Sequence, residues 1–498
     1  MYDEQAGIIK IEDIANDDQN RAVLNRIKGN KEGDHCTLAI QNEHDDDEDI
    51  INYVPEGAKD MGWLGYFVGK SDCVDGLCIN GFNGMSIDII KPFLMGINNN
   101  KSIYTLEYNR MHLSSEMFTL MGTFFKNNKN ISNLHINNCI VGVEGSRALA
   151  LALGSCKNNS LIDLNLMNNI ADEGMVDIIT SLSMHSQLQE IDFEGNSLRK
   201  NGCIAMATLL EHSITQLQTL DLGSNELDDE SIEVLVPALK NCNSLNTLRL
   251  FTNHLITKRG WKQLSSVLES PNSNISEFNI EDNDIDDEAL TSFADALKNN
   301  RTLVKLYVSI SSTEGETRRA FSNLLCDTST INSTFLSNHT LLSMFRGHLS
   351  YDREHPLRPL LQPLLILNGK GSLSKKKVAM IKILQYHNDF DMTPFFEWEF
   401  KVLPLMINWF ERASCFESMR GGIDVPENFE PNIGPRKLSC IYQFVRGMPV
   451  EYVETCLMKE LEDIKAAESR EKVYSHGGGR AALLAERKRS IMERLGHQ

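Results

Sequence analysis

The stretch that decides the fold runs from Leu217 to Leu245 and reads LQTLDLGSNELDDESIEVLVPALKNCNSL. Its first half has the spacing LxxLxLxxNxL, carried by Leu217, Leu220, Leu222, Asn225 and Leu227. Apolar and polar residues alternate in this half, which predicts a short strand with one face turned inward and one outward. The stretch therefore raises the question of what the asparagine does after the strand.

The same pattern recurs along the chain at a spacing of 27 to 30 residues. Clear copies begin at 131, 161, 188, 217, 245 and 275, and weaker copies at 74, 103, 303 and 331. Each strand pattern is followed by a helical one. In the copy from 275, the apolar positions i, i+3, i+4 and i+7 are Leu290, Phe293, Ala294 and Leu297. One strand and one helix make a coil of a solenoid, in which apolar faces are buried only between neighbouring coils.

The asparagine recurs where each strand bends away from the sheet, so that backbone groups lose their ladder partners while remaining buried. An amide side chain offers both a donor and an acceptor to those groups. We expect a stacked column with a structural role and no catalytic one, formed by Asn169, Asn196, Asn225, Asn253 and Asn283. Cys139 takes the same position in one copy.

This repeat, with a full helix in every unit, resembles the ribonuclease-inhibitor-like class of leucine-rich repeats. That class includes ribonuclease inhibitor, the Ran GTPase-activating protein and the repeats of NOD-like receptors. The resemblance covers about residues 74–345 and implies an α/β solenoid, or horseshoe, with parallel strands on the concave face, helices on the convex face and a helical C-terminal cap. The stretches FDMTPFFEWEFKVLPLMINWFERA and LSCIYQFVRGMP also resemble a group of uncharacterised algal leucine-rich repeat proteins.

The outward strand residues of such a solenoid line its concave face, and acidic residues dominate the middle of it. We predict a partner-binding surface made of Asp163, Glu190, Asp192, Glu194, Asp221, Arg249, Phe251, Glu277, Glu281 and Tyr307. Its negative field would attract a basic partner, and its two aromatic rings would serve as anchors. We therefore expect a non-enzymatic scaffold that binds another protein. The alternative is a solvated strand face that merely needs polar residues.

Two further functions stay open as alternatives. Resemblance to the Ran activator implies stimulation of a small GTPase, with Asn109 and Arg110 as candidates by location, although no longer motif of that family surrounds Arg110 and its acidic C-terminal tail is absent. Inhibition of a basic enzyme is the other. Acidic residues that follow the asparagines, as in DDES at 228–231 and DDEA at 286–289, predict helix caps in preference to metal ligands. We expect no metal, no cofactor and no catalytic residue.

Composition supports four segments. Residues 1–55 are rich in acidic side chains and are expected to be flexible, solvating the protein or masking a basic surface. The solenoid of about ten units spans 56–345, a helical cap 346–460 and a charged helical tail 461–498. The aromatic residues of the cap could alternatively form a partner groove, and the tail an amphipathic helix for a partner or an acidic surface.

The formal net charge of -19 argues against nucleic-acid binding. No apolar run approaches the length of a membrane span, and the N-terminus does not resemble a secretory signal. We therefore expect a cytoplasmic protein, with the nucleus as the alternative, and no membrane partner.

Overall fold

A computed structural model describes residues 2–387 except 32, 42–49, 82–85, 156–159, 170–171, 310–314, 345–357 and 370–372, and beyond them only Arg489. The chain forms two compact units. The repeat unit comprises Met1–Asp327 and Ser337–Ser372, and the second unit comprises Thr328–Leu336 and Leu373–Gln498. The predicted aromatic cap stretch and the charged tail lie outside the described residues, apart from Arg489.

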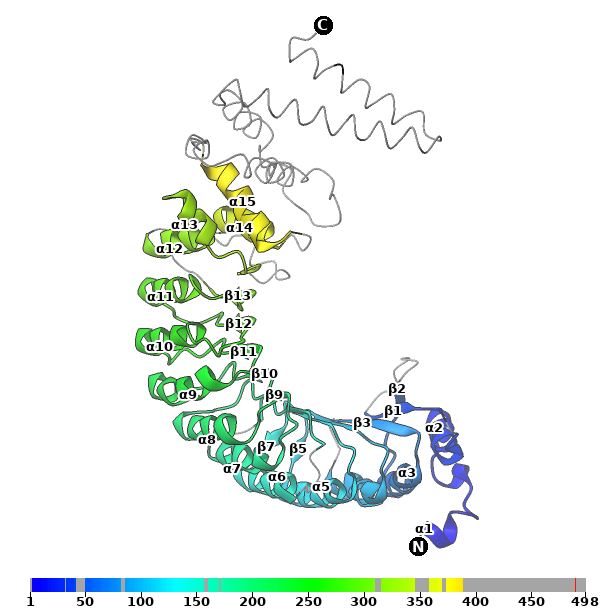
Figure 1. The fold of residues 1–498 in the computed structure, drawn as a ribbon. Helices are drawn as coiled ribbons and strands as arrows, with labels where there is room; N and C mark the ends of the chain where they lie inside the picture. Colours follow the sequence, from blue (N-terminus) through cyan, green and yellow to red (C-terminus); the bar gives the residue numbers. More distant parts are fainter. Residues whose placement is uncertain are drawn as a thin grey trace. The chain divides into compact units, whose positions relative to one another are not determined.

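A parallel sheet runs through the repeat unit (Figure 1). Its strand order is β13-β12-β11-β10-β9-β8-β6-β4-β3-β1-β2, so that each coil pairs with the next along the chain from β3 onward. The strands are β1 (Cys36–Ile40), β2 (Ile50–Tyr53), β3 (Val74–Asn80), β4 (Thr105–Asn109), β6 (Asn133–Asn137), β8 (Asp163–Asn165), β9 (Glu190–Asp192), β10 (Thr219–Asp221), β11 (Thr247–Arg249), β12 (Glu277–Asn279) and β13 (Lys305–Tyr307). A second, two-stranded sheet joins β5 (His112–Leu113) to β7 (Ile140–Val141).

Helices follow the strands and cover one side of the sheet (Figure 1). They are α3 (Ala58–Lys70), α4 (Ile87–Gly96), α5 (Ser115–Asn127), α6 (Val143–Ser155), α7 (Asp172–Ser181), α8 (Lys200–His212), α9 (Asp229–Asn241), α10 (Lys258–Leu268), α11 (Asp287–Leu297), α12 (Glu316–Leu325) and α14 (Arg358–Asn368). Inward strand residues such as Leu220 and Leu248 and inward helix residues such as Leu235 and Phe293 are fully buried between the two layers. This is the packing that the alternating and helical periods predict.

The asparagine column lies where the strands end. Oδ1 of Asn225 accepts from Leu198 N at 2.9 Å, while its Nδ2 donates to Phe193 O and Gly223 O, both at 2.9 Å. The same exchange between neighbouring coils is made by Asn169, Asn196, Asn253 and Asn283. Each asparagine thus satisfies buried backbone groups of its own coil and of the one before it.

A left-handed residue precedes each asparagine, a feature that the sequence pattern did not reveal. The positions with positive φ recur once per coil at Arg110, Asn138, Asn168, Gly195, Ser224, Thr252 and Asp282. The left-handed conformation turns the chain away from the strand in each of these coils.

The acidic residues before the helices act as caps. Asp228 accepts from Ser231 N at 2.9 Å and Asp286 accepts from Ala289 N at 2.8 Å. The next residue in each case binds the following coil, since Asp229 accepts from Thr257 N at 2.8 Å and Asp287 from Thr317 Oγ1 at 2.6 Å. The carboxylates of these two pairs are therefore engaged in joining helices.

The N-terminal segment differs from its expected flexibility. Residues 1–55 contain α1 (Tyr2–Gln5), η1 (Ile11–Asp13), α2 (Asp18–Gly29) and the two edge strands β1 and β2. Leu24, Leu38 and Tyr53 are fully buried and belong to the same core as the repeats. The apolar residues of this segment thus form a folded start to the solenoid despite its many acidic side chains.

The expected repeat start at 331 also differs from the structure. Residues 331–336 form α13 (Ile331–Leu336), which packs against α15 (Lys375–Tyr386) in the second unit. The coil that follows β13 instead places Ser343 opposite Lys305 in a parallel bridge, with Leu341 buried. The strand pattern of this coil therefore begins at 341 and not at the predicted 331, because α13 occupies residues 331–336.

Candidate binding surface on the strand face

The strand face is the side of the large sheet that points away from the helices. It carries all ten residues predicted to bind a partner, on β8–β13 or directly after those strands. The register aligns them in columns: Asp163 pairs with Glu190 across β8 and β9, and Asp192 with Asp221 across β9 and β10. The parallel register therefore makes neighbours of residues that lie a whole repeat apart in the sequence.

Cationic side chains neutralise part of this surface. Arg249 lies 3.4 Å from a carboxylate oxygen of Asp221 and 3.8 Å from one of Glu277, which Lys305 also approaches to 2.9 Å. His135, on β6, lies 2.8 Å from Asp163. The acidic residues expected to dominate this surface are thus partly paired with cations, and Asp221, which Arg249 contacts, also belongs to the most acidic part.

The strongly acidic part is a carboxylate cluster of Asp192, Glu194 and Asp221, whose ligand oxygens all lie within 4.8 Å of one another. Asp192 accepts from Asn165 Nδ2 at 2.9 Å and from Glu194 N at 2.9 Å, and Asp221 accepts from Gly223 N at 2.9 Å. Those hydrogen bonds fix the carboxylates in place. Three carboxylates so close together suit a cation, whether a metal ion or the charged end of an arginine or lysine.

The ionisation of the cluster reflects its burial. Asp221 is only 3% exposed, and this burial, with the nearby charge of Asp192, raises the pKa of Asp221 to about 6. Burial also raises the pKa of Asp192. The pKa of His135 is raised chiefly by its hydrogen bond to Asp163. The cluster is therefore an anionic site at neutral pH that loses charge when the solution becomes mildly acidic.

An aromatic ring borders the cluster. A methyl group added to Gly223 would come within 2.4 Å of the Phe251 ring, so this ring lies directly over the glycine. Gly223 lies two residues after Asp221, so the ring covers the same strand end that carries this carboxylate. Tyr307, the other predicted anchor, is half-buried on β13. A carboxylate beside an aromatic face is the combination that suits a guanidinium group.

The N-terminal part of the strand face has a different character, which sequence reasoning missed. A row of amides crosses four strands: Gln41 donates to Asn52 at 2.7 Å, Asn80 to Gln41 at 3.0 Å and Asn109 to Asn80 at 3.0 Å. Asn109 also donates to Glu107 at 2.7 Å. The only sequence sign of this row is an amide at the same place in successive coils.

The two candidates for GTPase activation fall at the end of this row. The amide of Asn109 is held by hydrogen bonds to Cys78, Asn80 and Glu107. Arg110 is an exposed residue of the left-handed turn, with φ 54°. Arg110 thus occupies the turn position that every coil from β4 to β12 fills with some residue.

Comparison with known proteins gives several related repeat regions, although no family model matches the chain. A segment of 158 residues is 34% identical to human NACHT, LRR and PYD domains-containing protein 13, and 170 residues are 30% identical to mouse NACHT, LRR and PYD domains-containing protein 14. These matches cover 30% and 34% of this chain but only 15% and 17% of the relatives.

The chain folds as a leucine-rich repeat solenoid. Its coils, ladder and parallel sheet confirm the predicted α/β solenoid, and segments of it are similar to the two NACHT, LRR and PYD domains-containing proteins just described. Among solved structures, an internalin from Listeria monocytogenes aligns with 71% of this chain and 95% of its own length, at 16% identity and a TM-score of 0.36. Leucine-rich repeats commonly use their extended surface to bind other proteins. Within the described residues, no helix is both long and apolar enough to cross a membrane.

Proposed function

We propose that this leucine-rich repeat protein is a non-enzymatic binding module whose acidic strand face holds a basic segment of another protein. The observation that carries the proposal is the carboxylate cluster of Asp192, Glu194 and Asp221 in the middle of the sheet. A surface that needed only to be solvated would gain nothing from crowding three carboxylates, because their mutual repulsion and the burial of Asp221 both oppose ionisation. A cationic partner group offsets both costs.

The chemistry of the surroundings favours arginine as that group. A guanidinium can form two parallel hydrogen bonds with a carboxylate and stack on an aromatic ring at the same time. Phe251 supplies the ring over Gly223, beside Asp221. Arg249 already contacts both Asp221 and Glu277, and Lys305 contacts Glu277, so a partner's charge has most to gain beside Asp192.

A charge-matched pair of variants tests the proposal. Asp192→Asn with Glu194→Gln removes two charges from the cluster, whereas Glu233→Gln with Glu269→Gln removes two exposed charges from the helix side. Binding of a fluorescent oligo-arginine peptide is measured by polarisation at low and high salt, with oligo-lysine and oligo-glutamate peptides as comparisons. We expect the cluster variant to bind oligo-arginine at least about tenfold more weakly, which is about 1.4 kcal/mol, and the control to match the wild type.

The same variants then serve in affinity capture from a cell lysate. A partner retained by the wild type and the helix-side control, and lost by the cluster variant, would be a partner of the strand face. Equal loss of peptide binding in both variants would reduce the interaction to net charge and contradict a specific site. If oligo-lysine binds as tightly as oligo-arginine, the preference for arginine is wrong, and only the proposal of an acidic binding surface remains.

A further inference from the structure

A second column of asparagines lies where the helices exit toward the next strand. Asn100, Asn128, Asn300, Asn338 and Asn368 are all buried there, at most 8% exposed. Asn300 shows the arrangement: its Nδ2 donates to Leu268 O of the coil before at 2.9 Å, and its Oδ1 accepts from Thr302 N at 3.0 Å and Leu303 N at 2.8 Å. Asn100 does the same with Val68 O, Ser102 N and Ile103 N. The column uses both ends of the amide.

His185 takes this position in the coil of β9, three residues before Leu188. Its Nε2 lies 3.1 Å from Leu153 O, a carbonyl 32 residues earlier, which is the same sequence separation as between Asn100 and Val68 and between Asn300 and Leu268. Because a carbonyl can only accept, Nε2 must carry the proton and Nδ1 must be the acceptor. The histidine thus reproduces the donor half of the asparagine.

Within the part of the chain that the structure describes, the acceptor half has no partner. His185 is 1% exposed, and no described residue donates to its Nδ1. Buried acceptors of this kind are costly unless a donor reaches them. The coil of His185 therefore differs from that of Asn300, in which two backbone N–H groups meet the side-chain acceptor.

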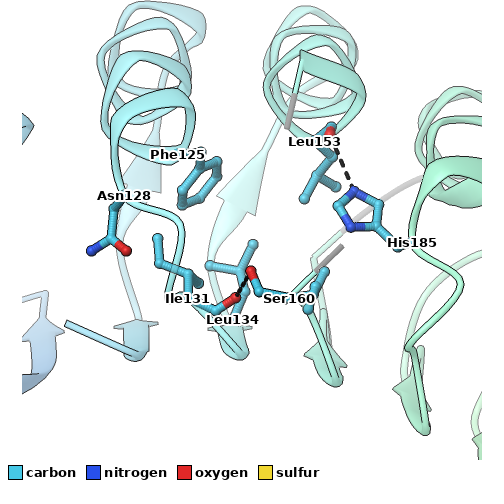
Figure 2. A pocket seen from close by; sticks show the side chains of 8 residues that line it. Phe125, Asn128, Ile131, Leu134, Leu153, Ser160 and His185 are labelled. Atoms are coloured by element: carbon cyan, nitrogen blue, oxygen red, sulfur yellow. Dashed lines mark hydrogen bonds between the residues drawn. The ribbon is translucent and has the colours of Figure 1, made fainter. Parts of the chain in front are cut away.

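His185 is one of the residues that line a small cavity. Figure 2 shows the His185 ring among the side chains that line this cavity, with a dashed line for its hydrogen bond to Leu153. The cavity has a volume of about 20 Å³ and is lined by Phe125, Asn128, Ile131, Leu134, Leu153, Ser160, Leu161 and His185. A space of roughly 10–15 Å³ measured in this way is enough for one water molecule and too small for a larger ligand. None of its lining residues bears a carboxylate, so a metal ion has no counter-charge there.

A second polar group is available to a water in this space. Ser160 Oγ donates its proton to Ile131 O at 2.8 Å, as the dashed line in Figure 2 indicates, and so keeps its lone pairs for an incoming donor. A water has two protons to give, and the cavity wall provides two acceptors in Ser160 and His185. The one other polar side chain in this lining, that of Asn128, is already bonded to Ile103 O and Asn130 N, and the remaining lining residues are apolar.

We propose that this cavity binds one water molecule, which donates to His185 Nδ1 and to Ser160 Oγ. The water and the imidazole together replace the asparagine of the helix-exit column: the ring ties the coil to Leu153, and the water supplies the donor that backbone N–H groups supply elsewhere. This site is independent of the strand face and of the function proposed for it.

A crystal structure of the full chain at high resolution, compared with that of Ser160→Ala, tests the site directly. The wild type should show one water in contact with both acceptors, and Ser160→Ala should lose it. Long-range proton–nitrogen NMR on the nitrogen-15-labelled protein gives a second measurement, with the exposed His254 as reference. The His185 signals should show a protonated Nε2 and an Nδ1 shifted as a hydrogen-bonded acceptor.

Three results would overturn the proposal. A cavity without water in the wild type would show that no water binds there. A proton on Nδ1 of His185 would show that this nitrogen is not the acceptor that the proposed water needs. Water density that persists unchanged in Ser160→Ala would remove the second partner. His185→Asn guards against misreading a folding defect, because it should restore the ordinary column, keep the chain folded and abolish the water.

Discussion

The coils before β8 and those from β8 onward end their strands in different ways. β4 and β6 each have five residues, and beyond them β5 and β7 pair again as a second sheet. From β8 to β13 each strand has three residues. The ladder position holds Met111 and Cys139 in the earlier coils and asparagine in the five coils from Asn169 to Asn283. Where an amide side chain takes over the backbone hydrogen bonds, the chain can leave the sheet sooner.

The same two regions differ on the strand face. The amide row joins Asn52 to Asn109 by hydrogen bonds along β2, β1, β3 and β4, whereas the later strands carry the carboxylate cluster. The inward positions are apolar throughout, because the fold requires it there. The outward positions carry no such requirement, so the change there from amides to carboxylates reflects what the surface does. We therefore propose the binding surface on the later strands.

The largest expected effect is one that the two regions should share. Leu106 on β4 and Leu248 on β11 are both fully buried at the same strand position. Leu106→Ala and Leu248→Ala should each lower the free energy of unfolding by about 2–5 kcal/mol, because each leaves a cavity in the core. Urea unfolding measures this. If only one of the two were costly, the view that both regions share one core would be wrong.

The second prediction concerns charge in the later region. Asp221→Asn should raise the free energy of unfolding at pH 7 by up to about 3 kcal/mol, since the raised pKa of Asp221, about 6 against an ordinary 3.8, means that its ionised form is disfavoured in the folded state. That cost is present above pH 6 and disappears as the pH falls toward 3.8, so the gain should vanish near pH 4. The same substitution should weaken binding of a basic peptide.

Asn279→Asp is the reciprocal control for this prediction. Asn279 occupies the equivalent place on β12, is 1% exposed and accepts from Glu281 N at 3.0 Å, as Asp221 accepts from Gly223 N. A carboxylate at this position should lower the free energy of unfolding at pH 7, and should lower it by a smaller amount at pH 4. An unchanged stability in both variants at both pH values would show that burial at these positions does not penalise charge.

The sequence predicts a large part of this structure because the same pattern of residues recurs in many repeats. The inward leucines, the asparagine column and the outward residues such as Asp192 recur at fixed places, so one good copy locates the others. The N-terminal coil escaped prediction because its acidic composition obscured apolar residues such as Leu24 and Leu38, which are buried. Composition averages over a segment, while a core depends on a few positions.

Apart from the asparagine column, features made by contacts between repeats were beyond the sequence argument. The carboxylate cluster needs the register that sets Asp192 beside Asp221, together with the side-chain direction of Glu194. The helix-exit column was missed because its asparagines follow helices of varying length and one copy carries His185 instead. In each case the chemistry arises from side chains one coil apart, and no single repeat contains it.

The third prediction extends the later region's ladder into the earlier one. Cys139 Sγ now accepts from Met111 N at 3.4 Å and lies 3.5 Å from Tyr108 O, the kind of groups that an asparagine binds elsewhere. Cys139→Asn should therefore raise the free energy of unfolding by about 1 kcal/mol, the usual net gain of a buried hydrogen bond. Cys139→Ser, with an acceptor too short to span both coils, should not. A loss of stability on Cys139→Asn would mean that the longer strands leave no room for the amide.

The smallest expected effect lies in the left-handed turn before each ladder residue. Thr252 has φ 53°, which is strained for a β-branched side chain, whereas Asn138 and Asn168 occupy the equivalent turns of earlier coils with a residue that tolerates this conformation. Thr252→Asn should raise the free energy of unfolding by about 0.5–1 kcal/mol, and Asp282→Thr in the next coil should lower it by a similar amount. Thermal and urea unfolding of the two variants would measure the difference. Thr252→Asn changes no charge and lies outside the carboxylate cluster, so it should leave peptide binding unchanged, whereas Asp282→Thr also removes a carboxylate next to Glu281 and tests stability alone. A change in binding by Thr252→Asn would mean that the geometry of the turn also shapes the strand face.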